Sequence, residues 1–191
     1  MRRFKIKFIK MKIPYGFMVF TWLPVFLLAC IVPSTADSQF YQLVERMIDE
    51  HLFGNVGVWS SAFPLTSKAV ANYICLVAPV CAVIFTIVTM RKSVVESSDV
   101  VEWSVGKQIF ILISFLGLVA FVFYFVFIGG RDFASLGNRY SFFGNYKMAF
   151  ALFSVGILYL LYVMTLFGYL AFKMLFIVVF RCAQVNIFRN R

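Results

Sequence analysis

The sequence predicts an all-α integral membrane protein: a single membrane domain, residues 1–191, folded as a bundle of four transmembrane helices with both termini in the cytoplasm. Composition is the first reason. The chain is 62% hydrophobic and 14% charged, whereas soluble domains are about 45–50% apolar and about 25% charged. A domain of this size leaves much of its surface exposed, so the apolar excess must face lipid.

Four long apolar segments are the second reason. They cover residues 13–32, 69–90, 108–128 and 148–172, and the last continues past Lys173. A helix of about 20 apolar residues crosses the hydrocarbon core, and uninterrupted apolar runs favour helices over barrel strands. The fourth segment exceeds one span, so we expect it to tilt or to extend into the cytoplasm. Pro14, Pro24 and Pro79 are candidate kink points.

The distribution of basic residues sets the predicted orientation. Of the 18 Lys and Arg, 13 lie in the N-terminal tail, the loop 91–107 and the C-terminal end, and five lie in the loops 33–68 and 129–147. Because Lys and Arg are retained in the cytoplasm, the loops 33–68 and 129–147, which carry fewer of them, are predicted to lie outside. The net charge of +10 is then explained by membrane orientation and by contact with lipid headgroups. We therefore expect no nucleic-acid partner. A signal peptide cleaved near Ala36 is the rival interpretation of the first segment, although its apolar run is long for a signal.

The two outer loops hold most of the polar sequence. In residues 39–53 apolar side chains recur at helical spacing, and Ser38 is a candidate N-cap. An amphipathic helix is therefore predicted, either lying on the membrane or the bundle, or presenting a docking surface to a partner. The loop 129–147 repeats a Gly-Asn pair typical of turns and carries aromatic residues suited to the headgroup level. It is either an interfacial belt or a contact surface.

The sequence contains no recognisable catalytic constellation. The motifs of serine hydrolases, P-loop NTPases, zinc proteases and dinucleotide-binding enzymes are absent. His51 is the single histidine, and the four cysteines are predicted to be small buried hydrophobes rather than disulfide or zinc ligands. We expect no enzyme activity, no cofactor, no metal and no small-molecule substrate. Segments 69–90, 108–128 and 148–172 carry no charge, which argues against a transporter or channel.

The apolar segments do contain residues suited to helix packing. Ala71, Ala78, Ala82, Ser154 and Gly156 are small enough to let helices approach closely in lipid. Polar side chains inside the segments are candidates for hydrogen bonds between helices: Asn72, Thr86, Thr89, Ser114 and Thr165. Both sets serve either the protein's own bundle or a foreign transmembrane helix.

Two blocks of sequence resemble a known family. Residues 66–75 (TSKAVANYIC), leading into Ala78-Pro79, resemble the start of the second span in immunity proteins against pore-forming colicins, of the type that protects against colicin A. Residues 162–167 (YVMTLF) followed by 171–175 (AFKML) resemble the last span of the same family. Length, basic ends, four spans and a large first outer loop agree as well. The third span and the second outer loop show no residue-level match.

The resemblance implies a bacterial inner-membrane protein that binds the pore-forming domain of a cognate colicin in the lipid bilayer and blocks it, without turnover. The face predicted to bind the toxin combines spans three and four with the second outer loop. It is chosen on exposure and chemistry, since no family residue maps there: Phe115, Tyr124, Arg131, Asn138, Arg139 and Tyr140. The alternative is a structural or exclusion subunit of a bacterial envelope complex for secretion or conjugation.

Overall fold

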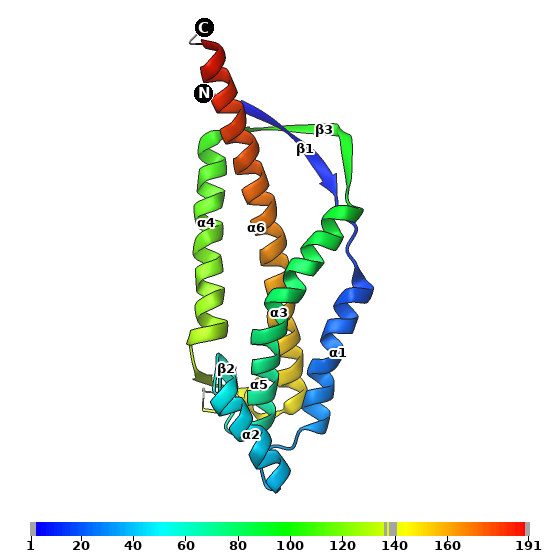
Figure 1. Ribbon diagram of the computed structural model, residues 1–191, viewed down its shortest axis with the longest axis vertical. Coiled ribbons are helices and arrows are strands. Elements are labelled where there is room, and N and C mark those ends of the chain that lie inside the picture. Colours follow the sequence, from blue (N-terminus) through cyan, green and yellow to red (C-terminus); the bar gives the residue numbers. More distant parts are fainter. Residues whose placement is uncertain (1–2, 136, 138–140, 190–191) are drawn as a thin grey trace.

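The computed structural model describes residues 3–135, 137 and 141–189, with side chains described outside 3–9, 94–105, 108, 174–175 and 177–189. Four long helices lie along the long axis of the molecule (Figure 1). The elements follow in the order β1 (Arg3–Lys10), α1 (Tyr15–Ile31), α2 (Gln39–His51), β2 (Val58–Trp59), α3 (Pro64–Lys92), β3 (Val94–Ser104), α4 (Val105–Phe123), the π-helical turn η1 (Tyr124–Ile128), β4 (Arg131–Asp132), α5 (Ser141–Asn145) and α6 (Lys147–Arg189).

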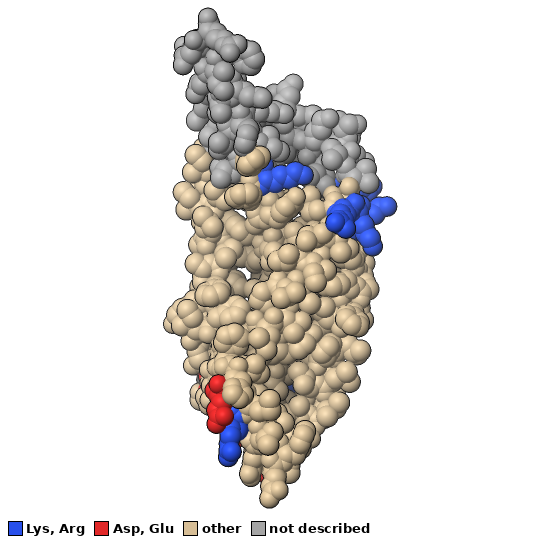
Figure 2. All heavy atoms as spheres, in the orientation of Figure 1, with Lys and Arg blue, Asp and Glu red and all other residues tan. Residues whose placement is uncertain are grey.

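Three helices of the described chain are long and apolar enough to cross a membrane. They are Pro64–Lys92, Ile109–Ile128 and Lys147–Lys173. α1 is also apolar but has 17 residues, about 25 Å of helix against a hydrocarbon core of about 30 Å. Figure 2 shows charged side chains near the two ends of one face and an uncharged band between them. The chain is therefore a mostly helical membrane protein, as the sequence predicts.

The helix boundaries follow the predicted apolar segments closely. α6 continues without a break from Lys147 past Lys173 to Arg189, which confirms that the fourth segment extends beyond a single span. α3 changes direction about half-way along (Figure 1), and Pro79 lies inside it. A proline removes one backbone hydrogen bond and crowds the preceding turn, which explains a bend there. Pro24 lies inside α1 in the same way, and Pro14 is its N-cap residue.

Two strand pairs were not expected in an all-α fold. β1 pairs antiparallel with β3, with Arg3 opposite Ser104 and Lys10 opposite Val94. The β1 sequence RFKIKFIK largely alternates basic and apolar residues, which is a strand pattern. β2 pairs in parallel with β4, Val58 opposite Arg131. The strand pairs thus join segments far apart in sequence at the two ends of the bundle (Figure 1).

The core lies between α1, α3 and α6. The small residues Ala71, Ala78 and Ala82 of α3 are at most 9% exposed, which confirms that they pack inside the bundle. Tyr162 of α6 is fully buried, and its ring stacks on Phe85 of α3 with centroids 5.1 Å apart. Close approach at the alanines and ring stacking beside them account for the tight α3–α6 contact.

The prediction of hydrogen bonds between helices is wrong at two positions. Thr86 donates to the carbonyl of Ala82, and Thr165 donates to that of Leu161, each inside its own helix. A threonine can satisfy its hydroxyl in this way without any neighbour. Asn72 instead binds the first outer loop, since its amide accepts from Phe53 N and donates to the Gly54 carbonyl, both at 2.9 Å.

Candidate functional site

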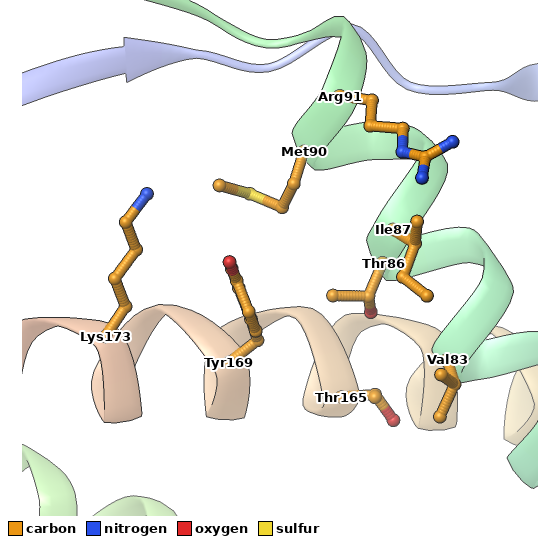
Figure 3. A pocket seen from close by; sticks show the side chains of 8 residues that line it. All are labelled: Val83, Thr86, Ile87, Met90, Arg91, Thr165, Tyr169 and Lys173. Atoms are coloured by element: carbon orange, nitrogen blue, oxygen red, sulfur yellow. The ribbon is translucent and has the colours of Figure 1, made fainter.

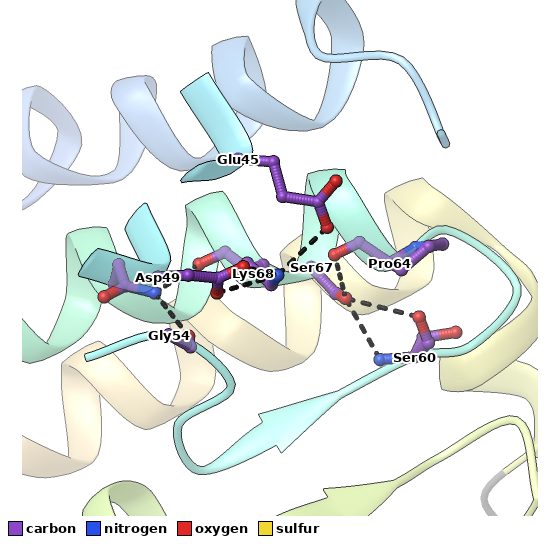
Figure 4. Close-up of polar contacts among 8 residues, drawn as sticks. Glu45, Asp49, Gly54, Ser60, Pro64, Ser67 and Lys68 are labelled. Carbon is purple, nitrogen blue, oxygen red and sulfur yellow. Dashed lines mark hydrogen bonds and ion pairs between the residues drawn. The ribbon is translucent and has the colours of Figure 1, made fainter. Parts of the chain in front are cut away.

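A buried lysine holds α2 against the bundle. Lys68, one turn into α3, is 5% exposed. Its Nζ lies 3.0 Å from Oε1 of Glu45 and 2.9 Å from Oδ1 of Asp49, both on α2 (Figure 4). A buried cation is tolerated when opposite charges and hydrogen bonds compensate it. The two carboxylates therefore fix the edge of α2 that faces α3.

This contact also determines which face of the predicted amphipathic helix, α2, meets the bundle. The helix begins at the predicted cap, where Ser38 Oγ accepts from Tyr41 N. Of its apolar stripe only Ile48 is buried, while Phe40, Leu43 and Met47 are 53–67% exposed. The stripe does not lie on the bundle, because Lys68 draws the acidic edge inward instead. Most of the apolar face of α2 points away from the protein.

The loops 33–68 and 129–147 bind each other through backbone groups. Arg131 N donates to the Gly57 carbonyl and Phe133 N to the Trp59 carbonyl, both at 3.0 Å. Gly57 has φ +63°, and a Cβ there would collide with the Val126 carbonyl oxygen. Only glycine combines this conformation with so close an approach. Residues 57–60 and 131–133 are therefore fixed relative to each other.

Gly144 and Asp132 make further contacts at this end of the bundle. A Cβ on Gly144 would overlap the backbone of Phe133, and the Gly144 carbonyl accepts from the Ser60 hydroxyl. Asp132 Oδ1 accepts from Ser61 N at 3.0 Å and from Ala134 N at 2.9 Å. Burial raises the pKa of the Asp132 carboxyl, but hydrogen bonds from Ser61, Ala134 and Ser135 outweigh it and hold the pKa below its ordinary value.

α4 is packed far more loosely than the other spanning helices. In its most apolar stretch 11% of the residues are buried, against 39% in α3 and in α6. Phe110, Ile113 and Phe121 are each more than 60% exposed. The Phe115 ring, by contrast, contacts α6: a Cβ added to Gly168 would lie 3.1 Å from this ring. α4 therefore touches the bundle along a narrow line and leaves most of its apolar surface free.

A groove of about 490 Å³ opens between α4 and α6 on this loosely packed side. Leu152, Gly156 and Leu160 recur every four residues, so they share one face of α6. Gly156 would place a Cβ in open space, with nothing within 4 Å. The lining carries no charged side chain: Phe121, Val122, Phe125, Val126, Phe143, Leu152, Phe153, Gly156, Ile157 and Leu160. The groove is an apolar slot with an open glycine in one wall.

The structure brings some of the predicted contact residues near this groove. Tyr124 is 52% exposed and lies in η1, between the groove residues Phe121 and Phe125 in sequence. The Arg131 guanidinium lies 5.6 Å from the Phe125 ring centroid, a cation–π contact at the outer end. Phe115 lies on α4 against Gly168, away from the groove lining.

The remaining predicted residues, Asn138, Arg139 and Tyr140, lie outside the described residues. The α6 wall of the groove was not among the predicted contact residues. Its signal in the sequence is the four-residue spacing of Leu152, Gly156 and Leu160, of which only Gly156 was predicted to pack helices, either within the bundle or against a foreign transmembrane helix. Comparisons with protein-family models, curated proteins and solved structures find no match to this chain. Its function therefore has to be inferred from the chemistry of these surfaces.

Proposed function

We propose that this protein is a bacterial inner-membrane immunity protein. It binds the pore-forming domain of a cognate colicin inside the bilayer and keeps the channel from opening. The groove between α4 and α6 is the observation that carries the proposal. An inserted toxin hairpin is helical and apolar, and helices associate in lipid through close packing at small residues. A slot with aromatic walls and an open Gly156 suits such a helix.

The loose attachment of α4 favours binding in a second way. Lipid chains already cover its exposed aromatic surface, so a protein helix that replaces them exchanges one apolar neighbour for another. The net gain then comes from better packing rather than from removal of water. α4 loses few contacts of its own if it shifts to admit a partner, because so little of it is buried.

The proposed topology has four crossings with both termini in the cytoplasm, α1 serving as the first. The β2–β4 pair supports this, since it joins the loops 33–68 and 129–147 at one end. The β1–β3 pair supports it at the other end, where it joins the N-terminal segment to the loop after α3. That second end carries the larger share of Lys and Arg in the sequence, which is the cytoplasmic signature.

A survival assay tests the function. The chain is expressed in a sensitive strain and challenged with a panel of pore-forming colicins, with survival and membrane potential as readouts. Selective protection against one or two toxins is expected. Uniform sensitivity, with the protein shown to be present in the inner membrane, contradicts the proposal and favours a structural or exclusion subunit of an envelope complex.

A groove-filling substitution tests the site. Gly156→Leu starts a side chain at a position where a Cβ would have no heavy atom within 4 Å, so we expect the fold to be preserved while the partner is excluded. Binding hot spots contribute about 2 kcal/mol or more, so the protective dose should weaken about thirtyfold. Gly117→Leu on α4 is the matched control, since that glycine is equally uncrowded and does not line the groove. Equal protection by both variants would remove the groove from the proposal.

A further inference from the structure

A second cavity, of about 470 Å³, opens between α3 and α6 near the end of the bundle that holds both termini. Its lining changes in character along its length (Figure 3). Val83 and Ile87 of α3 lie toward the middle of the spans, whereas Arg91 and Lys173 lie where the two apolar spans end. The cavity is thus apolar on its deep side and basic at its rim.

The two cations at the rim are Arg91 and Lys173. In the part of the chain that the structure describes, no ion pair involves Arg91 or Lys173, and both side chains are exposed. Figure 3 shows the Lys173 ammonium and the Tyr169 hydroxyl pointing from α6 toward the end of α3. Arg91 extends along α3 to the other side of Met90. Lys173 and Tyr169 therefore border the opening from α6, whereas the Arg91 side chain on α3 points away from them.

We infer that this cavity binds the phosphodiester headgroup of an anionic membrane phospholipid, with Lys173 and Tyr169 at the phosphate, Arg91 adding positive charge on the other side of the same rim, and an acyl chain along Val83 and Ile87. Basic pockets between membrane helices at the cytoplasmic side hold such headgroups. Arginine and lysine donate charge-assisted hydrogen bonds to phosphate oxygens. A free inorganic phosphate would use the rim alone, whereas the apolar side of the cavity matches the chain that a lipid carries.

The site is independent of the groove on α4, because the two share no lining residue. The hydroxyls of Thr86 and Thr165, which also line the cavity, donate to carbonyls of their own helices. They present methyl groups and lone pairs rather than donors to a ligand. Direct contact with the anion therefore rests on Lys173 and Tyr169, and Arg91 adds positive charge at the rim.

The test uses the full-length protein in nanodiscs of phosphatidylcholine with increasing phosphatidylglycerol. Thermal stability and the phosphatidylglycerol retained after purification are measured. Each cation near a membrane surface contributes about fivefold in affinity, so Arg91→Gln/Lys173→Gln should bind about thirtyfold more weakly. Lys92→Gln is the matched control, since Lys92 is exposed on the same helix end and does not line the cavity. It should behave as the parent chain.

Three outcomes overturn the inference. The first is an equal loss with Lys92→Gln, which would indicate only general attraction of a basic surface to anionic lipid. The second is full stabilisation by inorganic phosphate in pure phosphatidylcholine nanodiscs, which would indicate a free-anion site. The third is no response of the parent chain to phosphatidylglycerol. The charge-conserving variant Arg91→Lys/Lys173→Arg should retain most of the lipid, which separates loss of binding from loss of folding.

Discussion

The end of the bundle that holds the β2–β4 pair and the α4–α6 contact are held together in opposite ways. At the β2–β4 end, backbone hydrogen bonds, the ion pairs of the buried Lys68 and two crowded glycines fix segments far apart in sequence. Between α4 and α6, apolar side chains meet around open space. Directional contacts determine one geometry, whereas apolar contacts in lipid tolerate exchange with other apolar neighbours. The β2–β4 end therefore supplies rigidity, and α4 supplies a loosely held apolar surface.

The largest expected effect follows from removing both acids that pair with Lys68. In Glu45→Ala/Asp49→Ala the lysine ammonium remains buried without a counter-charge, which costs about 3 kcal/mol of unfolding free energy. Equilibrium unfolding in mixed micelles measures it. Lys68→Met is the informative counterpart, since it removes the buried charge and leaves two carboxylates that are 34% and 48% exposed. Lys68→Met should lose much less unfolding free energy than the double variant. An equal loss would show that the favourable energy of the ion pairs, rather than the cost of a buried unpaired cation, determines the effect.

A glycine series compares the two regions directly. Gly57→Ala combines positive φ with a backbone collision, so we expect a loss of about 2 kcal/mol or more. Gly144→Ala should behave similarly, because its Cβ would meet backbone as well. Gly156→Ala, on the loosely packed side, should leave the unfolding midpoint unchanged or slightly raised. Equal sensitivity at all three positions would contradict the contrast between the regions.

A pH series isolates Asp132. Its pKa is held below the ordinary value of about 3.9, so its charged form stabilises the folded state. This contribution is fully present above the unfolded-state pKa and is lost as the pH falls through the folded-state pKa. The difference in melting temperature between the parent chain and Asp132→Asn should be constant from pH 7 to 5 and should shrink below about pH 4. A difference that persists at the lowest pH would assign the effect to geometry rather than charge.

The smallest effect is expected where α4 meets α6. Gly168→Ala places a methyl group 3.1 Å from the Phe115 ring, so α4 or the ring must shift by a few tenths of an ångström. Because α4 is held by few contacts, we expect a stability change below about 1 kcal/mol and a measurable increase in the α4–α6 distance by spin-label spectroscopy. Gly117→Ala, uncrowded on α4, is the control. A large loss of stability would mean that α4 is held more firmly than its exposure indicates.

The parts of the fold that the sequence predicted are those dictated by local physics. The spanning helices follow from apolar run length, because lipid leaves the backbone no other partner. The cap at Ser38 and the continuation of α6 past Lys173 follow in the same way from neighbouring residues. Each requires only information within a few residues or a single helix.

The parts that were missed depend on distant segments. The strand pairs join residues 3–10 to 94–104 and 58–59 to 131–132, and no local pattern states which segment pairs with which. The orientation of α2 depends on Lys68, which lies in the next spanning helix, so amphipathicity alone left open whether the apolar face of α2 lies on the bundle, on the membrane or against a partner. The groove is a difference in packing between α3, α4 and α6, and hydropathy treats all three alike. The spacing of Leu152, Gly156 and Leu160 defines a face of α6, but the sequence does not state that this face borders a groove.

The β2–β4 pair also orders events during synthesis. Residues 57–60 leave the ribosome well before residues 131–144, whose backbone groups they bind. Until α4 has been delivered to the membrane and the chain has returned, the carbonyls of Gly57 and Trp59 lack those partners. A nascent or truncated chain would therefore expose unsatisfied backbone at this end. This end of the bundle therefore closes only after both segments have been made, however early residues 57–60 are folded.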